Sequence, residues 1–124
     1  MEFVATQNAP QAIGPYSQAV KHNGLVYTSG QIALTPTGEM TADDIVKQTH
    51  QVMKNVKAVL EAAGSSLNGV IKTTIFLSDM DNFVTVNEIY AEYFGDHKPA
   101  RATVAVKTLP KNAMIEIDCI AVCN

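Results

Sequence analysis

Arg101 is the side chain whose type and surroundings point most directly to ligand binding. It is the only arginine in the chain, and Thr103 and Ala105 follow it at two-residue steps. On a strand, this spacing places the guanidinium on one face among small side chains. Its forked N–H groups match the two oxygens of a planar carboxylate, so the pattern predicts carboxylate capture. The alternative, which the pattern alone slightly favours, is a structural ion pair, most plausibly with Glu116 on the adjacent strand.

Two acids near the end of the sequence could exchange protons. Glu116 and Asp118 alternate with apolar residues, so both share one face of a predicted strand. Such a pair on an apolar strand can hold one carboxyl with a raised pKa, available for water activation. Solvated charge on an edge strand is the alternative. The spacing alone does not decide between them.

Four further positions could line a pocket. Asn87 lies on the apolar stripe of a predicted helix, where its amide needs a partner from the fold or from a ligand. Tyr16 is either a core aromatic or a hydroxyl that faces a pocket. Ser29 and Gly30 end a predicted strand with a hydroxyl and with a backbone that lacks Cβ, which allows close approach of a ligand or simply forms a turn.

The composition excludes several function classes. The formal net charge is −3 and no block of basic residues is present, so nucleic-acid binding has no electrostatic support. No apolar run approaches the ~20 residues that span a bilayer. No basic residue precedes Lys21, which fits neither a secretory signal nor a transit peptide. We therefore expect a cytoplasmic location and no membrane partner.

We expect neither a metal nor an organic cofactor. The three histidines, His22, His50 and His97, are scattered over a turn, a helix and a loop, so they form no metal constellation. The sequence has no glycine-rich phosphate loop and no nucleophile-elbow motif. The two cysteines, Cys119 and Cys123, match no zinc or redox spacing and are expected to be reduced thiols.

The periodicity of the sequence places these residues on seven elements. Two extended runs flank Asn23-Gly24, the dipeptide that a type I′ hairpin turn favours. Two segments with apolar residues at three- and four-residue steps indicate helices, the first with Thr41 and Asp44 as a capping box and Gly64 at its end. The second helix is expected to start near Asp79 or Asp81. The predicted strands are Tyr16–His22, Leu25–Ser29, Val70–Ser78, Ala100–Lys107 and Met114–Val122, and the predicted helices are Thr41–Ala63 and 79–94.

The order β-β-α-β-α-β-β predicts one α+β domain over residues 1–124. Each predicted helix has a single apolar stripe, so both should pack on one face of a mixed sheet. The other face then carries apolar and small side chains that need cover. Self-association into an oligomer would supply that cover.

Seven motifs, taken together, resemble the Rid family (YjgF/RidA) over nearly the whole chain. They are AIGPYSQAV, YTSGQI, NVKAVLEAAG, VNEIYAEYF, KPARATVAV, LPK and IEIDCIAV. The resemblance implies a chorismate-mutase-like fold and a homotrimer whose strands form a barrel, with active sites between subunits. It also implies hydrolysis of 2-imino acids, such as 2-iminobutanoate and 2-iminopropanoate, to 2-oxo acids and ammonia, without a cofactor.

The resemblance also implies roles for individual residues. Arg101 would bind the substrate carboxylate, and Glu116 would orient or activate the attacking water. Many family members have Ser-Cys after the arginine, whereas this chain has Ala102-Thr103. Thr103 therefore stands where the usual pocket cysteine would be. Because imine hydrolysis by this route needs no thiol nucleophile, the same activity is still expected. The expected substrate-binding residues are Tyr16, Ser29, Gly30, Asn87, Arg101 and Thr103.

Two other functions are open to a protein with this resemblance. Relatives have been described as translation inhibitors or ribonucleases, but a ribonuclease would need a basic strip or paired catalytic histidines, and this sequence has neither. A regulatory module could bind a small molecule in the same cleft, since carboxylate capture by Arg101 serves recognition as well as catalysis.

Overall fold

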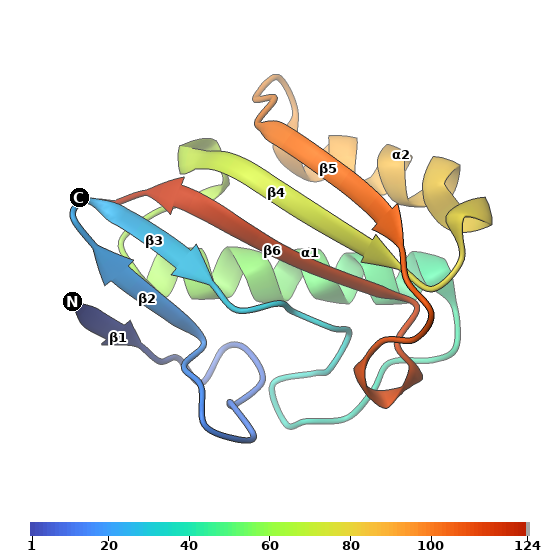
Figure 1. Ribbon diagram of the computed structural model, residues 1–124, viewed down its shortest axis with the longest axis horizontal. Helices are drawn as coiled ribbons and strands as arrows, with labels where there is room; N and C mark the ends of the chain where they lie inside the picture. The colour runs from blue at the N-terminus through green and yellow to red at the C-terminus, as the bar shows by residue number, and fades with distance from the viewer. Residues whose placement is uncertain (124) are drawn as a thin grey trace.

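A six-stranded mixed sheet carries two long helices on one of its faces (Figure 1). The computed structural model describes residues 1–123. The strand order is β1-β2-β3-β6-β4-β5, in which only the β4–β5 pair is parallel. The strands are β1 (Glu2–Val4), β2 (Ala19–His22), β3 (Leu25–Thr28), β4 (Val70–Leu77), β5 (Ala100–Ala105) and β6 (Ile115–Val122), and the helices are α1 (Ile45–Ala62) and α2 (Phe83–Phe94).

The β2–β3 hairpin confirms the turn expected at Asn23-Gly24. Both residues have positive φ, 53° and 79°, as a type I′ turn requires. Strand β2 begins at Ala19 and not at Tyr16, so Tyr16 lies in the loop between β1 and β2. Strand β1, antiparallel to β2, was not predicted. Its three residues are too few for an alternating pattern to be recognised in the sequence.

At the start of α1 the structure differs from the predicted capping box, and at its end the predicted glycine is confirmed. The capping box at Thr41 is wrong: Asp44 is the N-cap, and its carboxylate accepts a hydrogen bond from the Lys47 N–H at 3.0 Å. At the other end Gly64 has φ of 82°, the left-handed conformation that commonly follows a helix.

Helix α2 begins later than the sequence suggests. Asp79 caps a single 3₁₀ turn, Met80–Asn82, by accepting a hydrogen bond from the Asp81 N–H, and the α-helix follows from Phe83. It ends at Phe94, and the C-cap residue Gly95 has a φ of 59°. Within this helix, Phe83, Asn87 and Tyr90 follow at steps of four and three residues, so they lie in successive turns on one stripe.

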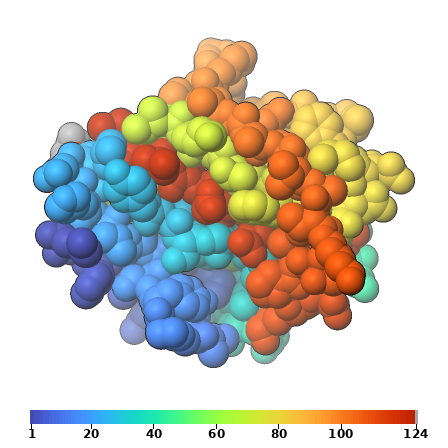
Figure 2. Space-filling view, viewed as in Figure 1, coloured from blue at the N-terminus to red at the C-terminus, as the bar shows by residue number. Residues whose placement is uncertain are grey.

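The two faces of the sheet differ sharply in cover. Alternate residues such as Ile75, Ile115 and Ile117 are fully buried between the sheet and the helices. The opposite face, seen in Figure 2, has no covering helix. It exposes apolar side chains that include Phe3, of which 74% is accessible, and Val104. The prediction of two helices on one face is thus confirmed. No helix formed by residues 1–123 has the length and apolar character needed to cross a membrane.

Candidate functional site

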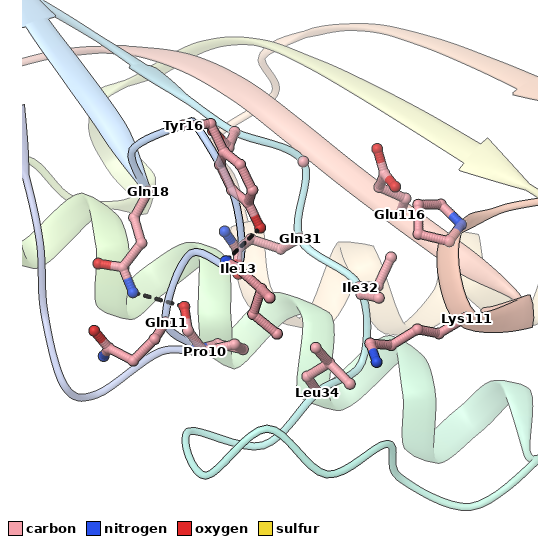
Figure 3. A pocket seen from close by; sticks show the side chains of 13 residues that line it. Pro10, Gln11, Ile13, Tyr16, Gln18, Gln31, Ile32, Leu34, Lys111 and Glu116 are labelled. Carbon is pink, nitrogen blue, oxygen red and sulfur yellow. Dashed lines mark hydrogen bonds between the residues drawn. The ribbon is translucent and has the colours of Figure 1, made fainter.

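Four of the predicted site residues, Tyr16, Ser29, Gly30 and Glu116, line one cavity of about 500 Å³. Tyr16 comes from the loop before β2, Ser29 and Gly30 from the segment after β3, and Glu116 from β6. Figure 3 shows Tyr16 and Glu116 on opposite sides of this cavity. Three segments far apart in the sequence therefore converge on the same space.

Glu116 is the acid of this cavity. Strand β6 pairs with both β3 and β4, so the interpretation of Glu116 and Asp118 as solvated charge on an edge strand is wrong. The predicted alternation is confirmed: Ile115 and Ile117 are buried and the two acids are on the other face. Partial burial raises the pKa of the Glu116 carboxyl, and the negative charge of Asp118 raises it further. Such a carboxyl can accept and return a proton at a less acidic pH than an exposed glutamate.

Gly30 lies directly against the Glu116 carboxyl group. The Gln31 N–H donates to the Ile117 carbonyl at 2.9 Å, and the Ile117 N–H donates back to the Gln31 carbonyl at 3.1 Å. This pairing holds the segment after β3 alongside β6. A Cβ on Gly30 would lie 2.8 Å from Cδ of Glu116 and closer still to its Oε2. Only a glycine leaves the carboxylate where it is.

Gly30→Ala is therefore expected to displace the Glu116 carboxylate. We expect a loss of catalysis of at least about tenfold, because groups that transfer protons must lie within hydrogen-bond reach of their partners. The loss should be measured as kcat/KM for imine hydrolysis. Gly38→Ala is a matched control: Gly38 has open space around it but a φ of 91°, so its substitution should lower thermal stability and spare activity. Equal activity of Gly30→Ala and wild type would contradict the assignment.

Tyr16 lies across the cavity from Glu116, and Ser29 lines the cavity next to Gly30. Tyr16 is 54% exposed, so the alternative of a plain core aromatic is wrong, and its hydroxyl oxygen accepts a long hydrogen bond of 3.4 Å from the Ile13 N–H. The Ser29 hydroxyl donates to the Ser17 carbonyl at 2.6 Å. Ser29 thus ties the loop that carries Tyr16 to the end of β3.

Gln18 also lines this cavity, although the sequence did not predict it as a site residue. Its buried amide accepts a hydrogen bond from the Thr6 N–H at 2.6 Å and donates to the carbonyls of Thr6, Ala9 and Pro10. These contacts hold the segment before β2 along one side of the cavity (Figure 3). The signal in the sequence is a polar residue directly before β2 and two positions after Tyr16.

Arg101 lies at a second location, against α2. Its Nη1 donates to Oδ1 of Asn87 at 2.7 Å, and its guanidinium carbon lies 5.0 Å from the ring centre of Tyr90 and 5.5 Å from that of Phe83. The Asn87 amide therefore has a partner within the fold. Asn87, Tyr90 and Arg101 line a separate cavity of about 390 Å³.

Within one chain, Arg101 and Glu116 cannot pair. Strand β4 separates β5 from β6, and Arg101 is level with Thr73 whereas Glu116 is level with Phe76. Thr73 and Phe76 are three positions apart on β4, so they point to opposite faces. The guanidinium is on the helix-covered face and the carboxylate on the uncovered one. The ion-pair hypothesis for Arg101 is therefore wrong.

Thr103 shares the strand face of Arg101, as the alternation predicts. Its hydroxyl oxygen is buried and has no hydrogen-bond partner among residues 1–123. Thr103 therefore has a free donor and a free acceptor close to Arg101, whereas Ser29 uses its donor within the fold.

Among the described residues, no histidine or cysteine lines the cavity of Glu116, whereas His97 lines the cavity of Arg101. His50 shares a 2.8 Å hydrogen bond with the Tyr93 hydroxyl, and the His97 ring is bonded to the Val70 carbonyl. Over residues 1–123, no group of three or more His, Cys, Asp or Glu side chains could hold a metal ion. Burial raises the pKa of the Cys119 thiol to about 11, so this cysteine is a protonated thiol at neutral pH.

The family model described as Endoribonuclease L-PSP matches residues 6–123. A 2-iminobutanoate/2-iminopropanoate deaminase from Salmonella typhimurium is 47% identical over 122 residues, which cover 96% of this chain and 95% of the relative. A solved Rid-family protein of unknown function from Yersinia pestis is 51% identical, with a TM-score of 0.96 over 98% of both chains. The chain belongs to the Rid family.

A further solved structure similar to this one contains a ligand. It is TdcF from Escherichia coli with bound serine, which superposes on this Rid protein with a TM-score of 0.94 over 100% of both chains at 44% identity. The family membership and the Rid fold expected from the seven motifs are thus confirmed. Relatives of this Rid protein at 47–52% identity include proteins named as deaminases.

Proposed function

We propose that this Rid protein hydrolyses 2-imino acids, such as 2-iminobutanoate and 2-iminopropanoate, to 2-oxo acids and ammonia. The observation that carries the proposal is the half-buried Glu116 carboxyl, with its raised pKa, set against Gly30 in a cavity that Tyr16 and Ser29 line. The deaminase names of relatives near 50% identity support the same reaction.

In the proposed reaction, Arg101 binds the substrate carboxylate and Glu116 moves the protons. The Glu116 carboxylate accepts a proton from water as the water oxygen bonds to the C=N carbon, and it passes this proton to the imine nitrogen to give a neutral carbinolamine. The carboxylate then accepts the hydroxyl proton as the C=O bond forms, and it passes that proton to the nitrogen as the C–N bond breaks. Ammonia and the 2-oxo acid leave. Water supplies the oxygen and two hydrogens, so no oxidant or cofactor is needed for the balance.

The remaining site residues would orient the substrate. The backbone at Gly30 and the hydroxyls of Tyr16 and Ser29 lie around the Glu116 cavity, where they can stabilise charge that develops on the attacked carbon and nitrogen. Asn87 and Thr103 lie with Arg101 and would complete the carboxylate pocket. Thr103 would contribute the hydroxyl that lacks a partner within the described chain.

One substrate can touch both Arg101 and Glu116 only if two copies of the chain contribute. The two groups are on opposite faces of one sheet, and the face of Glu116 carries uncovered apolar side chains. Burial of that face against neighbouring copies removes apolar surface from water. We therefore propose a homotrimer, the assembly implied by the family resemblance, with each site shared between two chains.

The trimer is tested by its mass in solution. Because the uncovered face is broad and apolar, we expect light scattering at micromolar concentration to give a single species of three chains. A charge placed on this face, as in Val104→Glu, should lower the mass, whereas Val84→Glu on the exposed side of α2 should not. A stable wild-type monomer would contradict both the assembly and the shared site.

The activity is tested by release of ammonia from imines made in place. An amino-acid oxidase or a threonine dehydratase supplies the 2-imino acid, and the rate of 2-oxo acid and ammonia formation is followed with and without the protein. We expect acceleration over the spontaneous rate. A wild-type protein that binds 2-oxobutanoate but gives no acceleration would instead favour the regulatory module, which the serine bound to TdcF also suits.

A further inference from the structure

Helix α2 presents a stripe of three side chains to the only arginine of the protein. Phe83, Asn87 and Tyr90 follow one another at four- and three-residue steps, and all three contact Arg101. Strand β5 is an edge strand, and Arg101 is exposed on it. A long side chain at such a position would normally sample many rotamers, so contacts from three successive turns of a helix need an explanation.

The aromatic rings control the position of the guanidinium. Its carbon is within 6 Å of both ring centres, the range in which a cation is attracted to the face of an aromatic ring. Asn87 occupies one N–H through Nη1. Within residues 1–123 no other hydrogen bond and no ion pair engages the Arg101 side chain. The rest of its N–H fork is therefore available to a carboxylate.

Tyr90 is itself held rigidly. Its hydroxyl shares a buried 2.7 Å hydrogen bond with Thr73, the residue directly opposite Arg101 in the β4–β5 register. Its ring packs on Phe94 with the centres 4.6 Å apart. Burial raises the pKa of the Tyr90 hydroxyl, so the ring remains a neutral phenol. The platform under the guanidinium is thus fixed to both the helix and the sheet.

We infer that Phe83 and Tyr90 are positioning residues for Arg101: their rings hold the guanidinium so that its free edge is presented to the substrate carboxylate. The inference rests on the proposed function for the identity of the ligand. The rings touch Arg101 and not the reacting atoms. Their loss should weaken carboxylate binding and leave the proton transfers at Glu116 largely unaffected.

The test measures binding of 2-oxobutanoate, the stable product, by calorimetry, together with KM and kcat for imine hydrolysis. Tyr90→Leu and Phe83→Leu are each expected to raise the dissociation constant and KM by roughly five- to thirtyfold, the range that a partly desolvated cation–π contact supports, with kcat changed by less than about threefold. Tyr90→Phe keeps the ring and should restore most of the affinity. Val84→Ala, on the exposed side of α2, should leave binding unchanged.

A double-variant comparison separates positioning from general structural damage. In an Arg101→Met background, Tyr90→Leu should change the dissociation constant by less than about twofold, because there is no guanidinium left to position. An equal loss in both backgrounds would overturn the inference, as would equal losses in Tyr90→Phe and Tyr90→Leu. If Tyr90→Leu does not fold, the half-buried Phe83 provides the same comparison. Because binding is measured directly, a wild type that binds 2-oxobutanoate without deaminase activity would refute the proposed reaction and leave this test intact.

Discussion

Replacing Glu116 by glutamine is expected to lower kcat for imine hydrolysis by about a hundred- to ten-thousandfold, the contribution typical of a positioned general acid or base. Glutamine has nearly the shape of glutamate, so the contact with Gly30 is preserved, but it cannot accept a proton from water. The effect should therefore be confined to catalysis. Initial rates of ammonia release from enzymatically generated 2-iminobutanoate would measure it, with circular dichroism and light scattering to confirm the fold and assembly.

Asp118→Asn is the matched control for Glu116→Gln. Asp118 lies on the same face of β6, two residues further on, but does not line the cavity. Its negative charge contributes to the raised pKa of Glu116, so its removal should retain most of the activity and move the acidic limb of the pH profile to lower pH. Near-normal rates in Glu116→Gln, or a larger loss in Asp118→Asn, would show that the proton transfer belongs to another residue.

Because the pKa of Glu116 is raised, activity and stability should respond to pH in opposite directions. The general base needs the ionised carboxylate, so activity should fall on acidification at a higher pH than for an exposed glutamate. Between the unfolded and the higher folded pKa the folded chain binds more protons, so stability is lost as pH rises through that window. Glu116→Gln removes this pH-dependent loss of stability. The variant should therefore have a higher melting temperature than wild type at neutral pH, and the difference should shrink as the pH falls below the pKa of the unfolded chain.

Local chemistry explains which parts of the fold were predictable. The Asn23-Gly24 turn and the glycine after α1 each need a conformation that few other residues adopt, so their residue types report their backbone geometry. The N-terminus of α1 was misplaced because Thr41 and Asp44 are both good caps. The Lys47 N–H donates to the Asp44 carboxylate, which makes Asp44 the N-cap. Residue spacing alone does not show which of the two side chains accepts such a hydrogen bond.

The site was predictable residue by residue but not as an arrangement. Two-residue alternation placed Glu116 and Arg101 on definite faces of their own strands. It could not show that β4, earlier in the chain, is inserted between β5 and β6. Consecutive strands are often neighbours but not always, and here the β4–α2–β5 connection makes β5 a parallel edge strand. The hypothesis of an Arg101–Glu116 ion pair failed for this reason.

The same separation leads to the prediction with the most distinctive outcome. Arg101→Met and Glu116→Gln should each be nearly inactive as pure proteins, since one lacks the carboxylate ligand and the other the base. Mixed trimers should nevertheless regain activity. If each site takes Arg101 from one chain and Glu116 from its neighbour, about one site in three contains both native residues in every trimer that holds both variants. The two variants, carrying different affinity tags, would be co-expressed and the mixed trimers isolated through both tags.

Recovery to roughly a third of the wild-type rate is the expected result for isolated mixed trimers whose sites are shared between two chains in a closed ring. Mixing the two purified proteins without subunit exchange serves as the control, and it should give only the sum of two residual rates. If Arg101 and Glu116 of the same chain served one substrate, every chain in the mixture would carry one damaged group and no site would recover. Arg101 and Glu116 lie on opposite faces of one sheet, so a single substrate can contact both only if the two residues come from different chains. Absence of recovery in mixed trimers would therefore contradict the shared site, even where both single variants are inactive.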